Sequence, residues 1–322
     1  ATDVAGNTSV ASTALTIITD NNDPTVPAAL NLANADDTGS SNTDNITQTL
    51  TGLTINGTGE NGSTVTLTSN VDGALAGSAV VAGGTWSFDI SLSDNASHSI
   101  TASATDVAGN TSTASTPLVI VTDNLANAPT GLDLDNADDS GSSNTDNITR
   151  TLTGLTISGS GENGAVVSLT SDIDGALTGS ATVAGGTWSI NVTLSDNATH
   201  SITAVQVDEA GNTSATSSAL TIITDNIAPN IPSALNLANA DDTGSSNTDN
   251  ITQTLTGLTI DGTGDNGTTV TLYSNVDGTL TGSAVVAGGT WSFNISLSDN
   301  ATHIVRAIAT DVGGNTRFAC TA

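Results

Sequence analysis

Apolar residues alternate with Ser and Thr along most of this chain. Trp86, Phe88 and Ile90 occupy every second position of one stretch, and residues 100–104 show the same alternation. No stretch has the period of about 3.6 residues that marks an amphipathic helix. Alternation over about four to eight residues is typical of a strand with one buried face. We therefore predict an all-β protein built from short, half-buried strands.

Turn residues separate these predicted strands. Asp72-Gly73, Gly83-Gly84 and Asp94-Asn95 are pairs that favour tight turns. The resulting density of about seven short strands per hundred residues is typical of an immunoglobulin-like Greek-key β-sandwich. A closed barrel is the alternative that this pattern leaves open.

The pattern repeats along the whole chain. The string Asp-Asp-Thr-Gly-Ser-Ser-Asn-Thr-Asp-Asn-Ile-Thr occupies residues 36–47, returns unchanged at 241–252, and returns at 138–149 with Ser140 in place of Thr. One Trp and one His keep their spacing in every copy: Trp86, Trp188, Trp291, His98, His200 and His303. Because the repeat covers the complete unit, function belongs to a row of modules and not to one active site.

Segments with Pro follow a recurring Thr-Asp pair and mark the module boundaries. We predict modules over residues 21–123, 124–225 and 226–322, while residues 1–20 match the end of a preceding repeat. The array forms an elongated rod in this prediction, because linkers that are short and contain Pro and Asp are held more firmly than Gly/Ser tethers. Residues 317–322 diverge from the other copies, so we expect the third module to lack its last strand.

Acidic residues dominate the charge, with 32 Asp and Glu against three Lys and Arg and a net charge of −29. This charge excludes nucleic acid as a partner and disfavours an anionic membrane surface. Membrane insertion is not expected either, since no apolar run approaches the roughly 18 residues of a spanning helix. A single cysteine, Cys320, excludes a disulfide within the chain. Only 2% of the residues are aromatic, so each small module needs a further source of stability.

Each module carries an acidic loop that favours calcium. Asp36, Asp37 and Asp44 lie close together in the first module, with Gly39 allowing a sharp bend. Three carboxylates on one short loop repel one another unless a cation binds among them. The predicted ligands of the three loops are Asp36, Asp37, Asp44, Asp138, Asp139, Asp146, Asp241, Asp242 and Asp249. A loop of Asx turns, or an acidic surface that serves solubility alone, is the alternative.

A second set of acidic residues lies where the linkers are expected to meet the modules. Each group contains the linker Asp, the acidic residue of a Gly-rich turn, and the Asp that precedes Val-Ala-Gly-Asn or its equivalent. In a sandwich of this topology these loops share the pole at which the preceding module arrives. We therefore predict interdomain calcium sites at Asp20 with Glu60 and Asp106, at Asp123 with Glu162 and Asp208, and at Asp225 with Asp265 and Asp311.

The repeated His and Trp residues give no sign of a metal, ligand-binding or catalytic site. Each His begins a strand without further His or Cys nearby to hold zinc, so we expect it at the surface or rim of its module. Each Trp continues an apolar alternation, which favours the core over a sugar-stacking platform. No nucleophile elbow, phosphate-binding loop or Ser-His-Asp set stands apart from the repeat, so we expect no enzyme.

The motifs of this chain resemble the bacterial immunoglobulin-like repeats of giant biofilm-associated and RTX adhesins exported by type I secretion. The resemblance covers essentially the whole chain. It rests on the linker at 225–229, the Gly-Thr-Gly-Glu-Asn-Gly turn at 57–62, the Gly-Gly-Thr-Trp-Ser hairpin at 83–87 and the Thr-Asp-Val-Ala-Gly-Asn-Thr-Ser loop at 105–112. It implies stalk modules on the bacterial cell surface, outside the cell, with calcium stiffening their joints. The first two linkers depart from the family pattern.

We therefore predict a structural extender segment of a surface adhesin. Its partners are the neighbouring repeats of the same chain, while other domains of the parent protein carry the adhesive target. The alternative is a repeated module that binds a glycan or another ligand directly. Such a module should expose aromatic residues, and their scarcity favours the extender.

The two ends of the sequence are complementary. Residues 13–19 match the last strand of a repeat, which the third module is expected to lack. The ends of a rod of three modules lie too far apart to meet in one molecule, so we predict weak, concentration-dependent head-to-tail pairing between molecules of this fragment, absent from the intact parent. A frayed N-terminus beside a less stable third module is the alternative.

Overall fold

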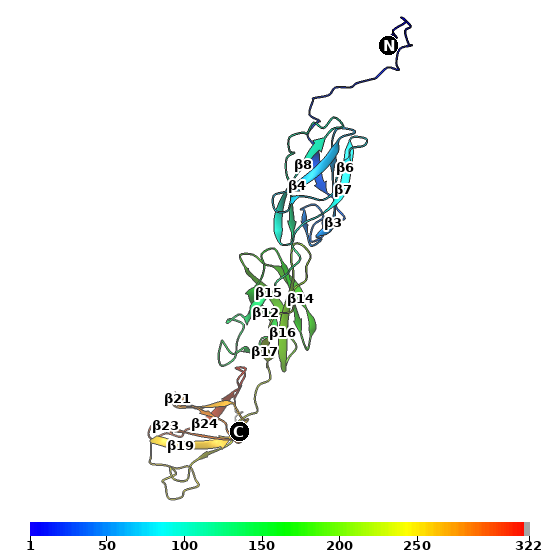
Figure 1. Cartoon of the computed structure of the whole chain (residues 1–322). Coiled ribbons are helices and arrows are strands. Elements are labelled where there is room, and N and C mark those ends of the chain that lie inside the picture. The colour runs from blue at the N-terminus through cyan, green and yellow to red at the C-terminus, as the bar shows by residue number, and fades with distance from the viewer. Residues whose placement is uncertain (319–322) are drawn as a thin grey trace. The chain divides into compact units, whose positions relative to one another are not determined.

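The structure, a computed structural model, describes residues 1–318, which form strands and loops (Figure 1). The all-β prediction is confirmed. No part of this described range forms a helix that could cross a membrane. The chain divides into two compact units, residues 1–125 with 208–212, and residues 126–207 with the chain from 213 onward. Cys320 and the end of the predicted third module lie outside the described residues.

The first module is a sandwich of two sheets. One sheet has the order β1-β3-β7, and the other has the order β2-β9-β8-β4-β5, with β6 also paired to β4. All these pairs are antiparallel except β2 with β9, which is parallel. The bounds are β1 Ala28–Leu32, β2 Ile46–Thr47, β3 Thr51–Thr58, β4 Thr64–Ser69, β5 Gly73–Ala74, β6 Ala79–Val80, β7 Thr85–Ser91, β8 Ala96–Thr105 and β9 Leu118–Thr122.

The second module repeats this architecture. Its sheets have the orders β10-β12-β15 and β11-β17-β16-β13-β14, with β11 and β17 parallel. The bounds are β10 Thr130–Leu134, β11 Ile148–Thr149, β12 Thr153–Ser160, β13 Val166–Ser171, β14 Gly175–Thr182, β15 Thr187–Thr193, β16 Ala198–Val207 and β17 Leu220–Thr224.

The third module has the same first sheet but a shorter second one. The orders are β18-β19-β23 and β21-β20-β24-β25, with β22 paired to β20. Within the described part of this module no strand takes the place of β11 or β17. The bounds are β18 Ser233–Leu237, β19 Thr256–Thr263, β20 Thr269–Ser274, β21 Gly278–Thr279, β22 Ala284–Val285, β23 Thr290–Ser296, β24 Val305–Thr310 and β25 Thr316–Phe318.

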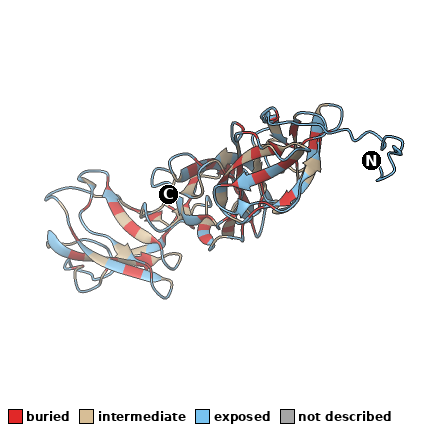
Figure 2. Cartoon of the chain, turned by 45° about the horizontal axis from the view of Figure 1, so that its top comes forward, coloured by how far each residue is buried: buried red, intermediate tan, exposed pale blue. Residues whose placement is uncertain are grey.

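Each sandwich buries the inward residues of both sheets, and Figure 2 shows red and blue alternating along the strands. In the first module Leu53 and Ile55 of β3 face Val65 of β4 within one core cluster. Trp86 belongs to that cluster and is 4% exposed, so the prediction that Trp lies in the core is confirmed. Gly57 makes room for it, because a Cβ there would lie 2.6 Å from the indole ring.

The prediction of a surface or rim histidine is wrong for His98 and His200, which are fully buried. Alternation along β8 points His98 inward, and polar neighbours then satisfy both ring nitrogens. Its Nδ1 lies 3.1 Å from Asp72 Oδ2, and its Nε2 lies 3.0 Å from the Ser93 carbonyl oxygen. The histidine therefore ties the turns at Asp72 and Ser93 to β8.

The first 27 residues precede the first strand of the first module. Within them, an isolated bridge joins Thr2 to Thr8. Leu15, Ile17 and Ile18 are exposed. This segment therefore carries apolar side chains that no sheet of the described chain covers.

Candidate functional site: aspartate loops and linker contacts

The acidic loop between β1 and β3 buries one of its carboxylates. Asp37 is 5% exposed. Its Oδ2 accepts a hydrogen bond of 3.1 Å from the Asn45 backbone N–H. Its Oδ1 is buried and has no hydrogen-bond partner in the described chain. Because buried polar atoms are nearly always paired, a water or a cation is expected at this oxygen.

The same arrangement recurs in the other two loops. Asp139 and Asp242 are buried, and their Oδ2 atoms accept from the backbone N–H of Asn147 and of Asn250, each at 3.0 Å. Their Oδ1 atoms are also without a partner among the described residues. The same unpartnered oxygen in all three loops indicates that it is a regular feature of the loop structure.

The other two predicted ligands of this loop have separate roles. Asp36 Oδ2 accepts from the Thr54 backbone N–H at 2.9 Å, which joins the loop to β3. Asp44 Oδ1 accepts from the Ile46 N–H at 3.1 Å and closes its own turn. Asp138 and Asp241 repeat the first contact, and Asp146 and Asp249 repeat the second.

Electrostatics distinguish Asp37 within the loop. Burial raises the pKa of Asp37, the Asn45 N–H opposes this, and the nearby Asp44 carboxylate raises it further. A divalent cation would reverse the effect by stabilising both carboxylates. Among residues 1–318, however, no group of three or more His, Cys, Asp or Glu side chains converges as a metal-binding cluster. A cation here would have to complete its shell with amide or hydroxyl oxygens, main-chain oxygens or water.

The acidic residues predicted at the junctions hold the linkers through hydrogen bonds. In the first unit, Glu60 Oε2 accepts from the Thr25 N–H at 2.8 Å. Asp106 accepts from the backbone and side chain of Asn110, whose Nδ2 also reaches the Asp20 carbonyl at 3.4 Å. Asp20 Oδ1 accepts from the Asn22 N–H.

The same contacts recur around the second and third linkers. Within the first unit, Asn212 joins Asp208 to the linker, because its Nδ2 donates to Asp208 Oδ2 and, at 2.9 Å, to the Asp123 carbonyl. Asp123 Oδ1 accepts from the Leu125 N–H. Within the second unit, Glu162 Oε2 accepts from the Asn127 N–H at 3.3 Å.

The third linker lies wholly in the second unit. Asp265 accepts from the Asn230 backbone at 2.7 Å and from its side chain at 3.1 Å. Asn315 Nδ2 donates to the Asp225 carbonyl at 2.9 Å and to Asp311. Asp225 Oδ1 accepts from the N–H two residues later. The acidic residues thus accept hydrogen bonds from linker N–H groups, while an asparagine side chain donates a hydrogen bond to a linker carbonyl.

Sequence reasoning missed these asparagines and also Gln206. Gln206 is buried in β16, where its Nε2 donates to the Asn127 carbonyl at 2.7 Å and its Oε1 accepts from the Glu162 N–H at 3.2 Å. The other modules have Ala104 and Ala309 at this position. A polar residue at an inward position of an alternating strand was the signal that could have identified it.

Within the second unit, the acidic loop of the second module contacts residues 312–315 of the third. The Ser142 N–H donates to the Val312 carbonyl at 3.0 Å, and the Arg150 guanidinium donates to the Gly314 carbonyl at 2.7 Å. A Cβ on Gly314 would lie 2.8 Å from the Ser140 carbonyl oxygen. In the first unit the Ser40 N–H makes the equivalent bond to the Glu209 carbonyl.

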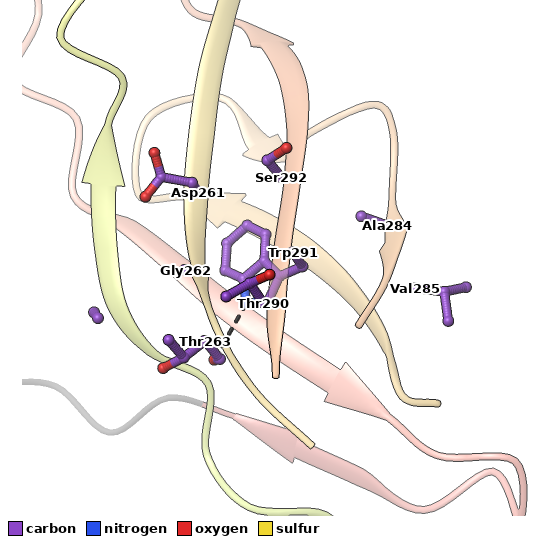
Figure 3. Close-up of a pocket in the computed structure, with 9 residues that line it drawn as sticks. Asp261, Gly262, Thr263, Ala284, Val285, Thr290, Trp291 and Ser292 are labelled. Carbon is purple, nitrogen blue, oxygen red and sulfur yellow. Dashed lines mark hydrogen bonds between the residues drawn. The ribbon is translucent and has the colours of Figure 1, made fainter. Parts of the chain in front are cut away.

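A shallow groove lies beside the tryptophan of each module. In the third module it has a volume of about 560 Å³ and is lined by residues that include Asp261, Val285 and Trp291 (Figure 3). Trp291 is itself buried, and its indole N–H donates to the Thr263 carbonyl at 3.2 Å. The groove therefore presents little of the aromatic face that stacking on a sugar ring requires.

A family model of the bacterial Ig-like domain matches residues 24–124, 125–226 and 228–321. The chain belongs to this family. Its three modules are thus tandem bacterial Ig-like domains.

The chain also matches several solved structures at low sequence identity. Chicken CNTN1 FN1–FN3 domains are 12% identical, with 92% of this chain and 98% of that chain covered and a TM-score of 0.32. Clostridium thermocellum CbhA fibronectin(III)-like modules are 15% identical over 62% of this chain and 95% of theirs, with a TM-score of 0.33. The BSP domain of a biofilm-associated protein is 15% identical over 92% of this chain and 65% of its own, with a TM-score of 0.22. No curated protein matches the sequence.

Proposed function

We propose that these tandem Ig-like domains form an extender segment of a bacterial surface adhesin, stiffened by calcium. The observation that carries the proposal is the buried, unpartnered Oδ1 atom of Asp37, Asp139 and Asp242. An oxygen of this kind in every acidic loop supports a repeated cation site. We assign calcium because carboxylate, carbonyl and water oxygens in a flexible loop suit it better than magnesium, which retains its own waters.

The contacts between modules support a spacer. The linker is bound on both its N–H and carbonyl groups, as at Asn230 and Asp225. The acidic loop of the second module touches the third through the Ser142 backbone. A chain segment with these contacts resists bending better than a free tether, and its partners are its own neighbours.

The junction carboxylates are proposed as further calcium ligands. Glu60, Glu162 and Asp265 each use one oxygen or more for the linker N–H groups. Calcium joining them to the linker Asp would stiffen the joint beyond what hydrogen bonds provide. A bacterial surface location, type I export and an adhesive target on other domains of a longer protein complete the proposal, and they rest on the family resemblance.

A calcium titration of the folded chain tests the metal site. Wild type should gain thermal stability with calcium, by about 2.7 kcal/mol at a hundredfold excess over Kd. The variant with Asp37→Asn, Asp139→Asn and Asp242→Asn should lose this gain. In EDTA the same variant should equal or exceed wild type, because three buried carboxylates have been removed.

Asp89→Asn is the matched control. Asp89 accepts from Thr54 Oγ1, and the other modules have Asn191 and Asn294 in that role. This variant should keep the full calcium response. A wild-type melting temperature that is the same in calcium and in EDTA refutes the loop site. Scattering tests the extender separately, since the maximum dimension should rise with calcium.

A further inference from the structure

We propose that Asn95, Asn197 and Asn300 are acceptor sites for N-linked glycosylation, with a nucleotide-activated hexose as the sugar donor. Each residue ends the turn that follows β7, β15 or β23. The site is a modification site of the folded modules. It goes beyond the extender role and does not depend on calcium.

The acceptor triplet Asn-X-Ser/Thr, in which X is not Pro, occurs at two equivalent positions in every module. The first is Asn-Ala-Ser or Asn-Ala-Thr, at residues 95–97, 197–199 and 300–302. The second is Asn-Ile-Thr, at residues 45–47, 147–149 and 250–252. Because this chain is rich in Asn, Ser and Thr, the triplet alone does not identify a site. The fold distinguishes the first position from the others.

The asparagine of the first position presents a free side-chain amide. Asn95 is exposed and has a φ of 51°, a left-handed conformation that Asn adopts in turns. Its backbone N–H donates to Asp94 Oδ1 at 2.8 Å, whereas its side-chain amide makes no hydrogen bond among residues 1–318. Asn197 and Asn300 are exposed in the same conformation and bond in the same way. Their Nδ2 atoms are therefore accessible to an enzyme.

The hydroxyl of the triplet is accessible as well. Alternation along β8 turns His98 into the core and leaves Ser97 exposed. Alternation along β16 exposes Thr199 in the same way. A transferase that reads the amide and the hydroxyl two residues later can therefore contact both without opening the module.

The second repeated position is closed to such an enzyme in the first two modules. Thr47 and Thr149 are fully buried. Their hydroxyls donate to the carbonyls of Asp36 and Asp138 at 2.7 and 2.6 Å. The acidic loop thus uses the hydroxyl that the transferase would need.

The fold also engages triplets that do not recur in every module. Asn110 and Asn212 donate through Nδ2 to Asp106 and Asp208, each at 2.8 Å. The hydroxyl residues of these two triplets, at 112 and 214, are buried. Asn191 lies inside β15, which pairs with β12, and its Oδ1 accepts from a threonine hydroxyl of that strand at 3.2 Å. The turn before β8 and its equivalents therefore form the most accessible set.

The reaction is a glycosyl transfer. Asn Nδ2 attacks the anomeric carbon of the nucleotide-activated hexose, and a new C–N bond forms. The bond from that carbon to the diphosphate oxygen breaks, and the nucleoside diphosphate leaves with the electron pair. One Nδ2 proton passes to a base of the transferase. The product is a hexose on an uncharged amide, so the net charge of the chain does not change.

The second module shows what a sugar would cover. The Asn226 N–H in the following linker donates to Asp196 Oδ1 at 3.2 Å. Asp196 precedes Asn197, so a sugar on Asn197 would lie beside this linker and shield its backbone from proteases.

A soluble N-glycosyltransferase that recognises Asn-X-Ser/Thr, supplied with UDP-glucose, tests the proposal on the folded full chain. Mass spectrometry of proteolytic peptides locates the sugar. Asn95, Asn197 and Asn300 should be modified at least about tenfold faster than Asn110 and Asn212, which react only after local opening. Modification of Asn110 and Asn212 as fast as Asn197, or no modification at the three turns, overturns the proposal.

Short peptides are the reference without a fold. Peptides of residues 107–115 and 194–202 should be modified at similar rates, because neither retains the hydrogen bonds of its module. If the first peptide reacts as slowly as Asn110 does in the folded chain, the sequence and not the fold causes the difference, and the structural argument is wrong.

Substitutions at the hydroxyl position test the second module by itself. Thr199→Ala should abolish modification of Asn197, and Thr199→Ser should retain it. Thr221→Ala is the matched control, because Thr221 is an exposed threonine of the same sheet that belongs to no acceptor triplet. Equal modification of Asn197 in the Thr199→Ala and Thr221→Ala variants contradicts the assignment. None of these results depends on calcium, so this proposal and the extender role can fail separately.

Discussion

The second and third modules share most of their sequence but differ at an edge of the sandwich. In the second, β17 lies beside β11 and β16, and Ile148 is half-buried. In the third, the described residues contain no strand there, and the equivalent Ile251 is exposed. The same residue is thus buried or exposed according to whether a partner strand is present. Burial in these small sandwiches depends on complete sheets.

The two modules also hold their linkers differently. The second uses a buried Gln206, which binds the Asn127 carbonyl, together with Glu162. The third has Ala309 and the shorter Asp265, which binds both the backbone and the side chain of Asn230. An asparagine in the linker replaces a glutamine in the strand. Two different sets of polar side chains therefore anchor the linker to the second and to the third module.

Truncating one core leucine in each module should have the largest effect on stability. It should also reveal the difference in stability between the second and third modules. Leu169→Ala in the second module and Leu272→Ala in the third each remove a buried leucine. Each should cost about 2–5 kcal/mol. Because its second sheet has fewer strands among the described residues, the third module should unfold first in wild type. Its truncation should lower the denaturant concentration at which it unfolds. Hydrogen exchange resolved by module measures this. Earlier exchange in the second module would contradict the comparison.

Gln206→Ala should have the next largest effect. It leaves the Asn127 carbonyl and the Glu162 N–H without their partner, at a cost of about 1–3 kcal/mol. Amide exchange at Glu162 should accelerate, and the second linker should loosen. Gln253→Ala removes an exposed glutamine and serves as the control. Unchanged protection at Glu162 would show that Gln206 is not an anchor.

Acid should weaken the contact between His and Asp in the second and third modules. Burial opposes ionisation of Asp174, but hydrogen bonds from Ser195 and the neighbouring His200 outweigh it, so its pKa lies below 3.8. Hydrogen bonds from Ser298 lower the pKa of Asp277. A lowered pKa in the folded state contributes stability above pH 3.8 that is lost as pH falls through the folded value.

The substitution Asp174→Asn tests this pH dependence. The variant should be less stable than wild type at neutral pH, and the difference should shrink below pH 3.8. Asp277→Asn should behave alike but with a smaller effect, since His303 is less buried than His200. Denaturant unfolding at several pH values provides the measurement. A constant difference across the acid range would exclude an ionic contribution.

One backbone position should give the smallest effect. Ala234 has a φ of 53°, and Gly131 occupies the same place in the second module with a φ of 64°. A left-handed conformation strains Ala but not Gly. Ala234→Gly should stabilise the third module by about 0.5–1 kcal/mol, after the entropy of glycine in the unfolded chain is subtracted. Gly131→Ala should destabilise the second module to a similar extent. If the two substitutions changed the free energy of unfolding in the same direction, the proposed strain at Ala234 would be refuted.

The sequence by itself determined the repeat, the all-β fold and the buried tryptophans. These features follow from local period-two alternation and from turn residues such as Asp72-Gly73, which act over a few positions. The acidic loops and the junction acids were also visible, although their calcium remains a prediction. The prediction that nucleic acid is not a partner follows from the net charge of −29 alone and stays a prediction.

Only the tertiary structure decided how the polar groups are used. His98 was expected at the surface or rim of its module, but its strand turns it inward toward Asp72, 26 residues earlier. Asn315 binds a carbonyl 90 residues away, and Gln206 one at a distance of 79. Within one loop, Asp36 is paired by a strand N–H while Asp37 retains a buried, unpartnered oxygen. Adjacent identical residues take different roles because burial and pairing depend on which distant backbone groups approach them.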